Sequence, residues 1–230
     1  NDLTTNLYIM KISQFIKKNF QYLFKNKGKI LIKYFSRNNK NFFYSLSHQI
    51  NFGSIKANNF YIRSLKKSKF YFEYGSGNSS MLAKRLSKNF ISIECDKSFF
   101  NDLKKRKIHE VKFTNIGPTL EYSYPIFFLR KKIVKYVEKI NSFILREKIP
   151  DLILIDGRFR VSCCLNLTKF KKELMKAKTI ILLDDFQKRN YYKILNKYFF
   201  IGTCGRMGIL KFKNNFPSKN TFSKFIEDPR

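Results

Sequence analysis

One stretch of the chain, residues 70 to 96, most constrains what it can fold into. It reads FYFEYGSGNSSMLAKRLSKNFISIECD: an aromatic run, a glycine turn, a short helical pattern and a second apolar run. This order predicts a strand, a tight turn, a helix capped by Ser79 or Ser80, and another strand. Glycine suits positions 75 and 77 because the backbone must turn sharply with no Cβ between it and a ligand. The helix start behind the turn carries a partial positive charge, so the stretch predicts a nucleotide pocket in an α/β sheet.

Two carboxylates narrow the choice of nucleotide. Glu73 lies two places before the first glycine, where it would repel a pyrophosphate and suit a cationic ligand. Glu94 ends the second apolar run, where a doubly wound sheet places an acid that holds a ribose. Together with Gly75 and Gly77, these residues resemble the first motif, E/D-x-G-x-G, of the class I S-adenosylmethionine-dependent methyltransferases. A plain βαβ crossover with a well-formed turn is the alternative.

The resemblance covers residues 66 to 212 and implies a Rossmann-like α/β fold. That fold has a mostly parallel seven-stranded sheet and a C-terminal antiparallel hairpin. Residues 1 to 65 would then be an N-terminal helical extension or lid, and residues 213 to 230 a loose polar tail. The cofactor implied is S-adenosylmethionine, and the residues that would bind it are Glu73, Gly75, Ser76, Gly77, Asn78, Ser79, Glu94, Cys95 and Asn115.

Three acids stand at the ends of the last two predicted parallel strands. Asp156 ends the apolar run that starts at Asp151, and Asp184 and Asp185 follow the run from 179 to 183. Parallel strands end at the same edge of a sheet, so these carboxylates should converge beside the cofactor. Carboxylates this close repel one another, and we expect a positive partner between them. A divalent cation such as Mg²⁺ is one candidate, and an arginine, Arg158 or Arg160, is the other.

The metal alternative is similar to the metal-dependent O-methyltransferases, which place acids after the fourth and fifth strands. On that resemblance Asp156, Asp184 and Asp185 would bind the metal, and Asp156 would be either a ligand or the general base. The Gly-Arg-Phe-Arg segment after Asp156 departs from those families. That segment would instead hold an anionic substrate through bidentate contacts. The catalytic candidates are Asp156 and Arg158.

The formal net charge of +31 has two explanations. A basic face gains affinity for nucleic acid by releasing counterions from phosphates. However, 36 of the 47 basic residues are Lys, the chain is rich in Asn, Ile, Phe and Tyr, and it lacks Trp. That pattern is typical of A- and T-rich coding sequence, which spreads lysines over solvated faces, whereas phosphate recognition prefers arginine forks. We expect salt-sensitive adhesion to polyanions and treat specific nucleic-acid binding as an alternative.

Two further patterns bear on membranes and on the compartment. Residues 7 to 24 form a basic amphipathic pattern, which predicts a helix that packs on its own domain or lies on an anionic membrane surface. No run of about 18 apolar residues predicts a transmembrane segment. The four cysteines, Cys95, Cys163, Cys164 and Cys204, lack C-x-x-C spacing, which favours reduced thiols in a cytoplasmic protein.

The sequence therefore predicts a single-domain enzyme that transfers a methyl group from S-adenosylmethionine to an oxygen of a small molecule or sugar. Two alternatives remain open. One keeps the fold and gives the basic surface an RNA acceptor. The other is a non-catalytic cofactor-binding or membrane-surface module, whose carboxylates would be paired with arginines.

Overall fold

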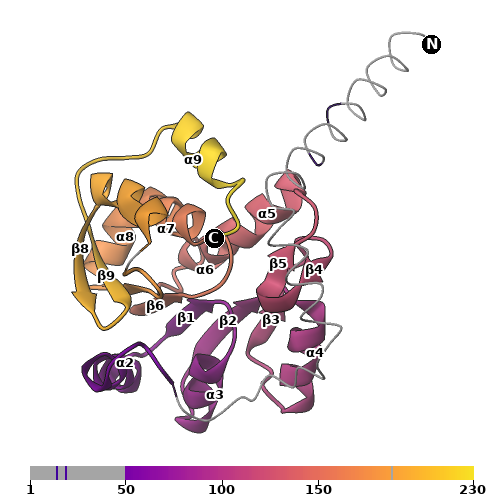
Figure 1. Ribbon diagram of the computed structural model, residues 1–230. Helices are drawn as coiled ribbons and strands as arrows, with labels where there is room; N and C mark the ends of the chain where they lie inside the picture. Colours follow the sequence, from indigo (N-terminus) through magenta and orange to yellow (C-terminus); the bar gives the residue numbers. More distant parts are fainter. Residues whose placement is uncertain (1–13, 15–18, 20–49, 188) are drawn as a thin grey trace.

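A seven-stranded sheet organises the chain (Figure 1). The computed structural model describes residues 14, 19, 50–187 and 189–230. The strand order is β3-β2-β1-β6-β7-β9-β8, and five neighbouring strands are parallel. These are β3 (Val111–Phe113), β2 (Phe90–Glu94), β1 (Tyr71–Tyr74), β6 (Leu152–Ile155) and β7 (Ile180–Leu183). The closing hairpin pairs β9 (Met207–Phe212) antiparallel to β7 and to β8 (Phe199–Cys204). The predicted mostly parallel sheet with an antiparallel hairpin is confirmed.

Helices cover both faces of the sheet. In Figure 1, α2 and α3 lie below the sheet, and α5 to α9 lie above it. One layer contains α2 (Ile55–Lys67), α3 (Asn78–Arg85) and α4 (Lys97–Lys105). The opposite layer contains α5 (Arg130–Val137), α6 (Asn141–Ile144), α7 (Arg160–Leu167), α8 (Lys171–Lys176), the 3-10 helix η4 (Asn190–Lys197) and α9 (Lys219–Phe225). No helix in the described part of the chain is both long and apolar enough to cross a bilayer.

Each face of the sheet has its own hydrophobic core, because side chains alternate between the two faces along each strand. In β6, Leu152 and Leu154 pack in the core under α2, α3 and α4, whereas Ile153 and Ile155 pack in the core under α5 and α7. All four side chains are fully buried. A strand covered on both faces reads as a continuous apolar run, which is why β6 was the clearest strand in the sequence.

The start of α2 extends the sheet domain before residue 66. The sequence suggested a loop over residues 51–59, but the Ser54 hydroxyl accepts a hydrogen bond from the Ala57 N–H and begins α2 one residue later. Tyr61 and Leu65 of this helix are fully buried against the sheet. The helix predicted over residues 7–24 and almost all of the proposed lid before residue 50 lie outside the described residues.

The segment after residue 212 is not a loose tail, which corrects the sequence-based expectation. Ser218 caps α9, and the apolar residues of α9 pack on the core that contains α7. The backbone N–H groups of Phe159 and Arg160 then donate to the carbonyl oxygens of Pro229 (3.1 Å) and Arg230 (3.0 Å). The C-terminal residues therefore satisfy the first backbone donors of α7.

Candidate functional site

A cavity of about 500 Å³ opens at the carboxyl edge of the parallel strands. It lies where the strand order reverses between β1 and β6, which is the place where open α/β sheets bind ligands. Its walls come from the turn after β1, the end of β2, and the loops after β6 and β7. Tyr122 and Ser123, from the connection between β4 (Thr119–Leu120) and β5 (Tyr124–Pro125), and Arg206, from the hairpin, complete it.

The glycine turn after β1 is packed backbone against backbone. Gly75 has φ +86°, and a Cβ placed there would lie 2.5 Å from the Cα of Gly157 in the loop after β6. The Gly75 N–H donates to the Ile93 carbonyl at 2.9 Å, which ties the turn to β2. A Cβ on Gly77 would meet nothing within 4 Å, so this residue borders open space in the cavity. Gly75 therefore shapes the turn, and Gly77 leaves room beside it.

The sequence predicted that Glu73 binds the cofactor. In the structure Glu73 instead lies beneath this turn and does not line the cavity. Its side chain is fully buried, and the carboxylate accepts hydrogen bonds from the hydroxyls of Tyr71 and Ser80. The Ser80 hydroxyl oxygen in turn accepts from the Gly77 N–H at 3.1 Å. Burial raises the pKa of Glu73, and the hydrogen bond from Ser80 partly offsets that rise. Glu73 thus supports the turn from inside the protein.

The buried state of Glu73 predicts a specific pH dependence of stability. Its folded-state pKa is raised above an unfolded value of about 4.3, so its contribution to stability is complete below about pH 4 and is lost as pH rises through the folded pKa. We expect the free energy of unfolding of the wild type, measured against Glu73→Gln in urea, to fall as the pH is raised from about 4 towards neutral. A difference that stays flat or rises over this range would contradict the assignment.

Glu94 does line the cavity, as predicted, and its carboxylate is already bonded within the protein. The residue is 3% exposed. Oε1 accepts from the backbone N–H of Cys95 and Asp96, both at 2.7 Å, and from the Ser123 hydroxyl at 2.8 Å, while Oε2 accepts from the Ser76 N–H at 3.1 Å. Burial raises the pKa of Glu94, and the Asp96 N–H is the strongest opposing influence. A ribose at Glu94 would therefore compete with Ser123 or share the carboxylate with it.

The other predicted cofactor residues divide between the cavity and its surroundings. Ser76 and Asn78 line the cavity, whereas Ser79 and Cys95 are buried behind it. Asn115 is exposed, its side-chain oxygen accepts from the Gly117 N–H at 2.8 Å, and it lines a separate hollow against α5. The predicted role of Asn115 in binding the cofactor is not supported by this position.

Arg160 joins the ends of β6 and β7. Its side chain is 7% exposed and makes three backbone contacts, all at 2.9 Å. Nε donates to the Gly157 carbonyl, Nη1 to the Asp184 carbonyl and Nη2 to the Asp156 carbonyl. Nη2 also lies 2.9 Å from Oδ1 of Asp156. One guanidinium therefore satisfies three strand-end carbonyls and one carboxylate.

Arginines also neutralise the remaining two aspartates. Asp184 is held by Arg206 in a bidentate pair at 2.9 and 2.8 Å. Asp185 lies 2.5 Å from Arg189 and 3.2 Å from Arg206. Within the described residues, no group of three His, Cys, Asp or Glu side chains is placed to hold a metal ion. The predicted metal site at Asp156, Asp184 and Asp185 is therefore not supported, because arginine supplies the counter-charge.

The two catalytic candidates, Asp156 and Arg158, both line the cavity. The Asp156 side chain is 35% exposed. Burial raises its pKa to about 7, with Arg160 opposing this rise and Asp184 contributing to it. Burial and the neighbouring Arg160 lower the pKa of Arg158. The site thus places a carboxyl group with a raised pKa in the same cavity as a guanidinium.

Six residues of the cavity lining were not among the site residues predicted from the sequence: Asp96, Phe99, Tyr122, Ser123, Gly157 and Arg206. Gly157 follows a strand directly, a signal that was present but not used, and its close packing on Gly75 explains the glycine. Ser123 and Arg206 carried no such signal, because their partners Glu94 and Asp184 lie 29 and 22 positions away in the chain.

Comparisons with known proteins bear on the fold. No family model matches the chain, and no curated protein matches it. Among solved structures, the chain is similar to a methyltransferase-like protein from Silicibacter pomeroyi DSS-3, with a TM-score of 0.61 and 20% sequence identity. The match covers 80% of this chain and 100% of that chain. The chain has a methyltransferase-like fold. This fold places the cavity at the point where the strand order reverses.

Proposed function

We propose that this protein is an S-adenosylmethionine-dependent methyltransferase that acts on an oxygen of a small molecule or sugar. One observation carries the proposal: an open glycine turn and a buried glutamate at the end of the next strand border the same cavity at the carboxyl edge of the sheet. Its volume of about 500 Å³ lies within the usual range for small-molecule sites.

The residues present fit the cofactor in three respects. Gly77 leaves open space where any side chain would narrow the cavity. Glu94 offers two carboxylate oxygens to a ribose, and among the described residues Oε2 accepts a single hydrogen bond, from the Ser76 N–H. The N-terminus of α3 at Asn78 borders the cavity, and the partial positive charge at a helix start suits a carboxylate. The bound cofactor would supply an activated methyl group on a sulfonium.

Asp156 would serve as the general base. Arg160 holds its Oδ1, and no described residue is hydrogen-bonded to its Oδ2. A base works best when its pKa lies near the working pH, and the pKa of Asp156 is raised to about 7. The carboxylate would accept the proton of the acceptor hydroxyl as that oxygen attacks. The remaining contribution of the protein would be to hold the two reactants in line.

Cofactor binding is tested by calorimetric titration with S-adenosylhomocysteine. We expect the wild type to bind and Glu94→Gln to bind roughly 10- to 100-fold more weakly, because hydrogen bonds to a charged group are worth more than neutral ones. Glu110→Gln is the matched control, since Glu110 pairs with Lys84 outside the cavity. An absence of heat with the wild type, or equal weakening in both variants, would contradict the proposal.

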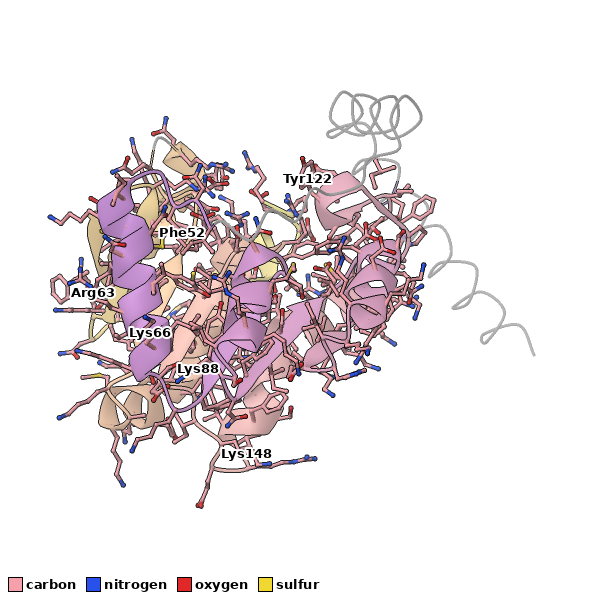
Figure 2. All side chains as sticks on the ribbon, turned by 90° about the horizontal axis from the view of Figure 1, so that it is seen from below. Phe52, Arg63, Lys66, Lys88, Tyr122 and Lys148 are labelled. Atoms are coloured by element: carbon pink, nitrogen blue, oxygen red, sulfur yellow. The ribbon has the colours of Figure 1, made fainter. Side chains whose placement is uncertain are left out.

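The distribution of lysines supports a small acceptor over RNA. Figure 2 shows Lys66, Lys88 and Lys148 on the side of the molecule away from Tyr122, which borders the cavity. A second group, Lys132, Lys135 and Lys139, lines the hollow beside Asn115. Lysines on several faces fit the compositional explanation of the charge better than a single stripe beside the pocket.

A further inference from the structure

The cations around the cavity differ in how they are neutralised. Arg160 and Arg206 each pair with an aspartate at less than 3 Å. Arg158 lines the same cavity, yet no acid in the described part of the chain forms an ion pair with it. Its Nε is buried without any hydrogen-bond partner. Among the residues that the structure describes, Arg158 is therefore a cation without an ion-pair partner at a candidate ligand site.

The ionisable groups that act on Arg158 do not supply the missing negative charge. Burial raises the pKa of both Cys95 and Tyr136 well above their usual values, so the thiol and the phenol are neutral at pH 7. The carboxylate of Asp156 is already engaged by Arg160. Arg158 is half-buried, and its buried Nε is costly to leave without a partner, so such groups are usually compensated by an opposite charge.

The backbone on both sides of Arg158 is fixed. Gly157 packs against Gly75, where neither residue has room for a Cβ. Phe159 has φ +55°, its side chain is fully buried, and its N–H donates to the Pro229 carbonyl at 3.1 Å. The C-terminal segment and the glycine turn thus hold the loop that presents Arg158 to the cavity.

We propose that Arg158 binds an anionic oxygen group, a carboxylate or a phosphate, on a molecule that occupies this cavity. A guanidinium recognises such groups through two parallel N–H···O bonds. The inference rests on the proposed function only in treating the cavity as a ligand site. The group has two possible sources: the amino-acid end of the cofactor, or an acidic substituent of the acceptor.

The unliganded protein provides the first test. If Arg158 lacks a partner until a ligand binds, Arg158→Met removes an uncompensated, partly buried charge. We expect its melting temperature to be unchanged or higher by about 2–4 °C. Arg106→Met, on the exposed end of α4, is the control and should not change it. A fall with Arg158→Met that the control does not show would overturn the proposal, because it would reveal a partner within the protein.

Ligand binding provides the second test and separates the two sources. S-adenosylhomocysteine carries a carboxylate, and 5′-methylthioadenosine has the same nucleoside and thioether without it. If the cofactor supplies the group, Arg158→Met weakens S-adenosylhomocysteine roughly 10- to 100-fold and leaves 5′-methylthioadenosine unchanged. If the acceptor supplies it, both ligands bind as in the wild type, and the thermal stabilisation that inorganic phosphate gives the wild type is lost.

The outcomes distinguish this inference from the proposed function. Equal affinity of wild type and Arg158→Met for both nucleosides, together with equal stabilisation by phosphate, would overturn the anion site. A wild type that binds neither nucleoside but keeps an Arg158-dependent response to phosphate would remove the proposed methyl transfer and leave the anion site standing.

Discussion

Arg160→Met will lower the free energy of unfolding by about 3–5 kcal/mol, the range for removing one partner of a buried ion pair. The guanidinium is the shared partner of three strand-end carbonyls and of Asp156. Methionine keeps much of the volume but leaves these acceptors unsatisfied at the junction of β6 and β7. The loss should therefore exceed that of an ordinary surface substitution, which is within about 0.5 kcal/mol.

Urea unfolding followed by circular dichroism measures this difference. Arg85→Met, on the exposed side of α3, is a matched control that removes the same charge from the surface. A loss of less than about 1 kcal/mol with Arg160→Met would show that the junction is held mainly by apolar packing.

Gly75→Ala will destabilise the protein by roughly 2–4 kcal/mol and abolish binding at the cavity, because it strains a left-handed residue and forces two loops apart. The added Cβ would meet the Gly157 backbone at 2.5 Å. This contact cannot be relieved by rotating a side chain, because the atoms that the Cβ would meet belong to the backbone of Gly157 and Asp156. The turn after β1 must then move away from the loop after β6, and the cavity between them changes shape.

The control for this substitution comes from the same chain. Gly202→Ala in β8 places a Cβ where nothing lies within 4 Å and should change stability little. Unfolding in urea and titration with S-adenosylhomocysteine are measured on both variants. Wild-type stability in Gly75→Ala would mean that the two loops are not in backbone contact.

The strands and the glycine turn could be predicted because their signals are local. The aromatic run before Gly75 and the four apolar residues of β6 each identify a strand without reference to the rest of the chain. The position of Glu94 at the end of β2 followed from the same pattern, and the structure places it at the cavity.

The counter-charges of the aspartates could not be predicted in the same way. Asp184 meets Arg206 only because β9 pairs antiparallel with β7 in a register that puts Gly208 opposite Leu183. That register depends on the whole hairpin, so three acids and several arginines in the sequence were equally compatible with a metal. In the structure, arginines supply the counter-charge of all three aspartates.

At two other places the structure differs from the prediction although the sequence contained a pattern that indicated the correct result. Glu73 lies two positions after Tyr71 in β1, so alternation places both side chains on the same buried face of the sheet. In the C-terminal segment, Phe222, Phe225 and Ile226 have helical spacing, and Ser218 precedes them as a cap. A segment that is mostly polar can still dock through three apolar residues.

The central claim is that the cavity at the carboxyl edge binds the methyl-donor cofactor, and hydrogen–deuterium exchange with and without S-adenosylhomocysteine tests it most directly. We predict slower exchange in three segments: the turn at 75–80, the end of β2 at 94–96 and the loop at 156–160. In the hairpin of β8 and β9, we predict no change except at Arg206, which lines the cavity. Protection that is absent from all three segments, or that appears only elsewhere in the chain, would contradict the claim.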